Sequence, residues 1–141
     1  MAGKYSRLTG HGRLVWFVER LWYLAQSLPQ YTVPLAQIAE FDQDCWFGPG
    51  TPPTCRAVAA HARRILAADL TYPIILSADG ALMDGGHRIA KAYLLDQRTI
   101  AAVRFSVDPE PDYLLAPDAP LPREPRFPRS AWDVSHLPSN A

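Results

Sequence analysis

Residues 83–88 read Met-Asp-Gly-Gly-His-Arg and stand between a hairpin pattern and an amphipathic helical pattern. Before them, an apolar run at 73–76, turn residues at 77–80 and a second run at 81–83 predict two short strands joined by a tight turn. After them, residues 88–95 carry apolar side chains at helical spacing. Two consecutive glycines at such a junction allow positive φ angles and a close approach between the backbone and a ligand. The segment therefore predicts a strand, a turn and a helix with an open N-terminus.

Further elements extend this pattern in both directions along the chain. Residues 31–33 have strand character before Pro34, and residues 99–105 form another apolar run. Residues 53–68 predict a helix that begins at prolines. Its expected inner stripe consists of Val58, Ala59, Ala62, Ile65 and Leu66. Helices interspersed with short strands and a hairpin predict an α/β (α+β) fold, with a small mixed sheet and flanking helices rather than a doubly wound sheet.

An N-terminal amphipathic helix is expected within residues 1–30, over about residues 13–28. Apolar side chains recur there every three or four residues, and three aromatic residues flank their stripe. The helix either packs into the fold or forms the contact of a homodimer. The stripe consists of Leu14, Phe17, Val18, Leu21, Leu24, Ala25 and Leu28, and the flanking aromatics are Trp16, Trp22 and Tyr23.

The C-terminal segment, residues 106–141, differs in composition from the central domain expected at residues 31–105. It holds eight of the fourteen prolines and carries six acidic against three basic side chains. Proline at this density removes backbone donors and disfavours helix, so we expect an extended, mildly acidic tail. Its spaced apolar residues either pin the tail to the domain as a strap, which we favour, or present it to a partner. They are Tyr113, Leu114, Leu115, Phe127 and Trp132.

Charge and cysteine content exclude several classes of protein. Lys plus Arg and Asp plus Glu each number 14 among 141 residues, and this balance argues against a protein whose main task is holding a nucleic-acid backbone. Cys45 and Cys55 have no spacing typical of a metal knuckle or a redox pair, so two reduced thiols are expected. Glu19 and Arg20 interrupt the N-terminal apolar stretch, so neither a signal peptide nor a membrane span is expected. The cytoplasm is the expected location.

The chemistry-bearing residues gather at the strand-to-helix junction. Amides in the first turn of a helix lack intrahelical acceptors, and the helix dipole favours an anion there. His87, Arg88 and Lys91 add donors, so Gly85, Gly86 and these three side chains predict a phosphate site. Asp84 is a candidate for holding Mg²⁺, orienting His87 or accepting from a substrate hydroxyl. The alternative is a tight turn with a structural aspartate and a surface arginine.

The order of these motifs resembles the ParB/sulfiredoxin superfamily. The resemblance covers about residues 31–105 and rests on the PIIL strand at 73–76, the Asp-Gly turn at 79–80, the DGGHR segment and the strand at 100–105. It implies a nucleotide triphosphate or diphosphate bound with Mg²⁺. It also implies that Thr71 and Tyr72, just before the PIIL strand, line the other side of the nucleotide.

Three branches of that superfamily differ in this motif. Sulfiredoxins have a catalytic cysteine where this chain has Gly86, so sulfiredoxin activity is not expected. ParB partitioning proteins carry G-E-R-R and a downstream helix-turn-helix domain, and the proline-rich tail argues against such DNA-site recognition here. Free-serine kinases carry D-G-H-H-R, the nearest of the three motifs. In that branch an acidic residue after the first strand resembles a base, for which Glu40, Asp42 and Asp44 are the candidates.

Two function classes follow from these observations. The first is a ParB-like nucleotide- or phosphate-binding protein, acting as a nucleotide hydrolase or a nucleotide-dependent kinase, with Asp84, His87 and Asp42 as catalytic residues. The second is a non-catalytic module that a nucleotide switches or that contacts protein partners. A nuclease is a weaker third option, because the sequence has no carboxylate cluster with two-metal spacing.

Overall fold

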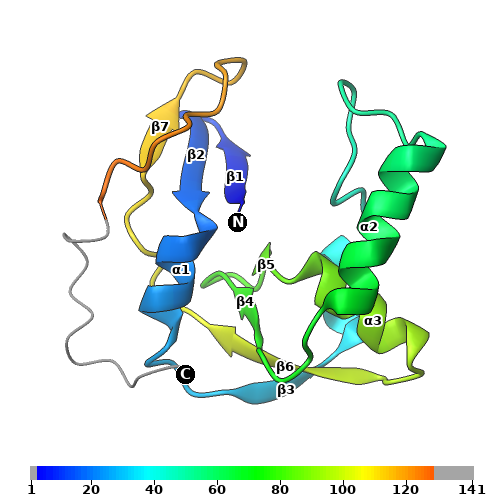
Figure 1. Ribbon diagram of the computed structural model, residues 1–141. Helices are drawn as coiled ribbons and strands as arrows, with labels where there is room; N and C mark the ends of the chain where they lie inside the picture. The colour runs from blue at the N-terminus through cyan, green and yellow to red at the C-terminus, as the bar shows by residue number, and fades with distance from the viewer. Residues whose placement is uncertain (1–2, 129–141) are drawn as a thin grey trace. The chain divides into compact units, whose positions relative to one another are not determined.

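The structure, a computed structural model, describes residues 3–128. The chain forms two compact units (Figure 1). Within the described residues, unit 1 combines residues 3–28 with residues 105–128, whereas unit 2 consists of residues 29–104. The chain is thus a mixture of helices and strands in two small sheets, one in each unit, as the predicted α+β class requires.

Unit 2 is built on a four-stranded mixed sheet in the order β3-β6-β4-β5. Its strands are β3 (Tyr31–Pro34), β4 (Ile74–Leu76), β5 (Leu82–Asp84) and β6 (Thr99–Arg104). β6 runs parallel to β4, and the other two pairs are antiparallel. The predicted hairpin at 73–83 is confirmed, because Ser77 N donates to Ala81 O at 2.8 Å across the turn. All four strands lie where the sequence predicts them.

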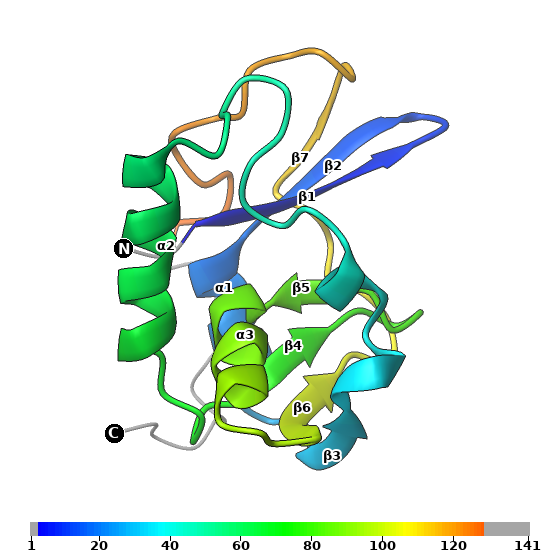
Figure 2. The same cartoon turned by 90° about the vertical axis from the view of Figure 1, so that its right-hand side faces the viewer.

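Two helices and two 3₁₀ turns complete unit 2. α2 spans Cys55–Ala67 and α3 spans Gly86–Leu94, while the turns η1 and η2 span Leu35–Gln37 and Ala39–Asp42. Figure 2 shows α3 beside β4 and β6. The residues of the core are fully or almost fully buried, and α3 contributes Ile89 and Ala92 to it. The other buried members are Val33, Leu35, Ile38, Ile74, Leu76, Leu82, Ile100 and Ala102.

Helix α2 confirms the predicted helix at 53–68 but not its predicted inner stripe. None of its residues is fully buried, and Val58 and Leu66 are 49% and 72% exposed. The half-buried side consists of Ala57, His61 and Ile65, of which only Ile65 belongs to the predicted stripe. The stripe prediction was right for Ile65 and wrong for its other four members, because polar contacts, described below, fix the orientation of this helix against α3.

Unit 1 begins with a hairpin, whose second strand takes the place of the first part of the expected N-terminal helix. β1 (Lys4–Thr9) and β2 (Gly12–Phe17) pair in antiparallel fashion, and α1 begins only at Val18 and ends at Ala25. The prediction of a helix over 13–28 was therefore wrong for residues 13–17 and for residues 26–28, which lie beyond the end of α1. These residues are rich in aromatic and β-branched side chains, and their backbone pairs with strands on both sides. Only Val18, Leu21 and Ala25 of the expected stripe are buried on the helix.

The proline-rich segment pairs with the N-terminal hairpin over its described part. β7 (Tyr113–Leu115) runs antiparallel to β2 and gives unit 1 the strand order β1-β2-β7. Trp16, almost fully buried, donates its Nε1 hydrogen to Pro109 O at 2.8 Å. Residues 105–128 therefore form a strap, as favoured, although the strap holds the N-terminal segment. Residue Trp132 of the expected strap lies outside the described residues.

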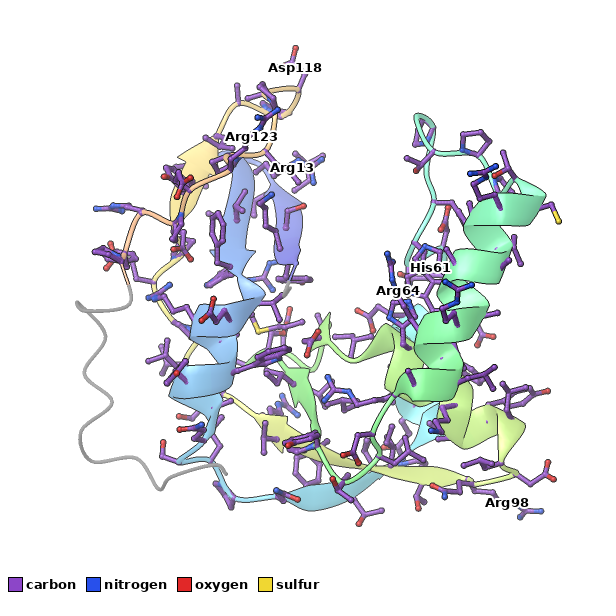
Figure 3. The ribbon with its side chains drawn as sticks, viewed as in Figure 1. Arg13, His61, Arg64, Arg98, Asp118 and Arg123 are labelled. Carbon is purple, nitrogen blue, oxygen red and sulfur yellow. The ribbon has the colours of Figure 1, made fainter. Side chains whose placement is uncertain are left out.

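A buried ion pair joins the strap to α1. Asp112 is fully buried and accepts from Arg20 Nη1 at 3.2 Å and from Phe17 N at 3.1 Å. Arg20 also donates to Glu110 O at 2.6 Å, and its guanidinium lies over the Phe127 ring. Arg13 on β2 donates its Nε hydrogen to Pro117 O at 3.4 Å, and Figure 3 labels Arg13, Asp118 and Arg123 at the same end of this unit. Within residues 3–128, no helix has the length and apolar character needed to cross a membrane.

Candidate functional site

The junction between β5 and α3 has the predicted strand–turn–helix geometry. Gly85 is the N-cap residue of α3 and has a φ of 129°. A Cβ atom at this position would clash with Ile74 Cγ2, so the side chain of Ile74 occupies the space that a side chain at residue 85 would need. The first helical hydrogen bond of α3 runs from Ile89 N to Gly85 O at 3.0 Å. The amides of residues 86–88 precede it and form the open N-terminal turn.

Arg88 holds the junction together instead of pointing freely toward an anion. Its Nη2 donates to Asp84 Oδ2 at 2.6 Å, and its Nη1 donates to Pro73 O at 3.1 Å. The carbonyl of Tyr72 accepts a third, longer bond of 3.5 Å from the same side chain. Arg88 thus connects the start of β4, the end of β5 and the first turn of α3.

Lys91 likewise has a structural partner, at the C-terminal end of α2. Its Nζ donates to Leu66 O at 2.9 Å and to Ala68 O at 2.6 Å, where the helix leaves its last carbonyls without intrahelical donors. Lys91 also shares a shallow, open pocket with Thr71. Thr71 donates its amide and hydroxyl hydrogens to Asp69 Oδ1, and these bonds lower the pKa of the Asp69 carboxyl.

His87 is in contact with two aromatic residues that lie far from it in the sequence. His87 Nε2 and His61 Nδ1 are 2.8 Å apart, a hydrogen bond between two imidazoles. The indole of Trp46 stacks on both, with centroid separations of 4.9 Å to His61 and 4.8 Å to His87. Phe47 packs edge-on against His61. These rings join α2, the segment before it and the first turn of α3. Figure 3 shows His61 and Arg64 on α2.

Both imidazoles are held toward their neutral form. Burial lowers the pKa of His87, and the neighbouring His61, Arg64 and Arg88 lower it further, against an opposite effect of Asp84. Burial and Arg64 likewise lower the pKa of His61. At neutral pH the pair is therefore uncharged, and one ring donates a hydrogen bond that the other accepts.

A cavity of about 300 Å³ lies beside the helix N-terminus. Gly86 contributes to its wall together with Glu40 and Asp44, two of the three candidate bases. Glu40 Oε2 accepts from Leu82 N at 3.1 Å, and Asp44 Oδ1 accepts from the amides of Trp46 and Phe47. Asp42, the third candidate base and one of the three residues expected to be catalytic, is not among the residues that line this cavity.

The side chains that could act as metal ligands do not form a complete metal site in the described part of the chain. No group of three or more His, Cys, Asp and Glu side chains between residues 3 and 128 has the geometry to hold a metal. Asp84, the predicted Mg²⁺ ligand, is engaged by Arg88. Mg²⁺ is commonly held by one or two carboxylates together with substrate phosphates, so an ion here would have to arrive with a nucleotide.

The structure brings some predicted residues together and adds others that the sequence did not reveal. Asp84, Gly85, Gly86, His87 and Arg88 form one junction, whereas Thr71 and Lys91 line the separate open pocket. His61 was not predicted, because nothing in its local pattern distinguishes it from any other helical histidine. The run of acidic and aromatic residues at 40–47 was the only local signal for the cavity wall.

Comparisons with models of protein families, with curated proteins and with solved structures found no match to this chain.

Proposed function

We propose that this protein binds the phosphate group of a nucleotide at the N-terminus of α3. The observation that carries the proposal is the turn at Gly85. Because this N-cap residue has no side chain, the amides of residues 86–88 lie at a helix start without a side-chain cap. Since Arg88 and Lys91 already have partners, the backbone amides and His87 would supply the contacts. The resemblance of residues 31–105 to the ParB/sulfiredoxin superfamily supports a nucleotide as the source of the phosphate.

The test is a titration with ATP, ADP, CTP and GTP, each with and without Mg²⁺, followed by amide NMR. The amides of Gly86, His87 and Arg88 should shift with a saturable dependence on one nucleotide. The N-terminus of α2 is an internal control, because Thr54 Oγ1 already accepts from Ala57 N at 3.1 Å and caps it. Equal shifts at both helices would mean unspecific anion binding, and no shift at α3 would refute the proposal.

Phosphoryl transfer or hydrolysis is a second candidate, favoured by the carboxylate of Glu40 in the wall that Gly86 shares. Positioning and charge neutralisation supply most of the catalysis in such reactions, with one carboxylate orienting the nucleophile. Turnover of the bound nucleotide that is lost in Glu40→Gln but kept in Asp42→Asn would support this candidate. Binding without turnover in the wild type would identify a non-catalytic module.

A further inference from the structure

The cavity beside α3 combines aromatic walls with acidic groups. Phe41, Trp46 and Phe47 supply three aromatic rings to its lining, and Glu40 and Asp44 supply two carboxylates. No lysine, arginine or histidine among the described residues lines it. A cavity with this lining favours a positively charged, partly apolar occupant over an anion or a neutral molecule.

Glu40 gives the strongest reason for expecting a cation. Its Oε2 atom accepts from Leu82 N, but its Oε1 atom is buried and has no hydrogen-bond donor within the described part of the chain. Burying a carboxylate oxygen without a donor costs free energy unless a positive charge lies close by. Such a charge in the adjoining cavity would compensate Glu40 through space.

The raised pKa of the neighbouring Cys45 thiol agrees with two negative charges in the cavity wall. Cys45 also lines the cavity, and the pKa of its thiol is raised first by burial and then by the charges of Glu40 and Asp44. Both carboxylates therefore act on the same part of the wall. Asp44 additionally fixes the two aromatic residues that follow it, because its Oδ1 accepts from Trp46 N at 3.1 Å and from Phe47 N at 2.7 Å.

We propose that this cavity binds a small organic cation of the methylated ammonium class. Methylated ammonium groups interact favourably with aromatic faces and need few hydrogen-bond acceptors. A free amino acid fits less well, because its carboxylate would meet two acidic side chains and no basic one. This proposal is independent of phosphate binding at α3, although both involve the neighbourhood of Gly86.

The test compares choline with 3,3-dimethylbutan-1-ol, which has the same shape without the charge. The probes are titrated into the full chain at constant ionic strength, and the amides of residues 40–47 and 86–90 are followed by NMR. Choline should saturate and should bind at least about tenfold more tightly than the alcohol. Equal affinities of the two probes, or no saturation by choline, would overturn the proposal.

Variants then localise the binding. Glu40→Gln retains an acceptor for Leu82 N but removes the charge, and Trp46→Leu removes an aromatic wall; each should weaken choline binding by about tenfold. Asp42→Asn removes a carboxylate from the same 3₁₀ turn outside the lining, and should leave the affinity unchanged. A correctly folded Glu40→Gln protein with wild-type affinity would contradict the assignment.

Phosphocholine separates this proposal from the previous one. If both sites exist, it should perturb the amides of residues 86–88 and those of residues 40–47 together. A nucleotide response at residues 86–88 without any choline response would overturn the cation proposal alone. A choline response without a nucleotide response would leave the cavity assigned and refute phosphate binding.

Discussion

Gly85 is the residue at which the smallest change should have the largest effect on unit 2. An added Cβ atom would meet both Ile74 Cγ2 and Ile74 Cβ at less than 3 Å, and the φ of 129° disfavours any L side chain. We expect Gly85→Ala to lower the free energy of unfolding by about 3 kcal/mol. Gly80→Ala is a matched control, because its φ is also positive but no atom lies within 4 Å of the added carbon. Urea unfolding measures both, and equal losses would contradict the described contact with Ile74.

The paired imidazoles predict a dependence of stability on pH. The folded state lowers the pKa of His61 and His87 below the usual value of about 6.5, so unfolding takes up protons in acid. The contribution of the two histidines to the free energy of unfolding is therefore fully present above about pH 6.5 and decreases as the pH falls below that value. When both imidazoles are protonated, His61 Nδ1 and His87 Nε2 both carry a hydrogen, so two N–H groups face each other and neither can accept.

Thermal unfolding at about pH 7.5 and about pH 5.5 tests this prediction. His61→Gln should lose part of the acid sensitivity of the wild type, because the remaining imidazole then titrates without its histidine neighbour. His11→Gln is the control, since His11 is exposed in the turn between β1 and β2. An identical acid shift in the wild type and in His61→Gln would show that the pair does not control stability.

Among the elements, α2 is held by polar contacts at its start, its centre and its end. It buries no residue completely, and Thr54, His61 and Lys91 provide its cap, its central contact and its C-terminal donor. We expect Lys91→Met to keep the aliphatic part of the side chain while releasing the carbonyls of Leu66 and Ala68. The C-terminal amides of α2 should then exchange hydrogen several-fold faster, as hydrogen-exchange NMR can measure.

The same variant separates the structural role of Lys91 from the phosphate-binding role that the sequence suggested. If its contacts with α2 are its main task, Lys91→Met should bind nucleotides as the wild type does. Loss of nucleotide binding with unchanged exchange in α2 would reverse that assignment. Lys91→Arg, which keeps the charge and several donors, serves as the conservative comparison.

Elements with strong local signals were predictable, and elements that depend on distant partners were not. The hairpin at 73–83 carries its own turn residues, so β4, β5 and the start of α3 follow from nearby sequence. Residues 13–17 fit a helical stripe as well as a strand, and only pairing with β1 and β7 decides between them. The orientation of α2 likewise depends on the contact between His61 and His87, which no local sequence pattern predicts.

For the whole molecule, the two units predict different responses to loss of the C-terminal segment. A variant that ends at Arg104 lacks β7 and the carbonyl of Pro109 that accepts from Trp16. The remaining β1–β2 hairpin is a two-stranded ribbon, which is marginally stable by itself. We therefore expect the amides of β2 to lose their protection from hydrogen exchange.

Unit 2 provides the control within the same variant. Its sheet and its core cluster consist entirely of residues 29–104, so β4 and β6 should keep slow exchange. Continued protection of β2 would show that the hairpin does not need the strap. Loss of protection in both units would mean that unit 2 depends on residues beyond Arg104.

The interleaved chain path of unit 1 has a consequence for protein synthesis. Residues 3–28 emerge from the ribosome before unit 2, whereas residues 105–128 emerge after it. At about 5–20 residues per second, roughly 4–15 s of translation separate the two halves of unit 1. During that interval the aromatic residues of the hairpin lack their strap and are exposed to chaperones. Codon-dependent pauses within residues 29–104 would lengthen this exposure without changing a single amino acid.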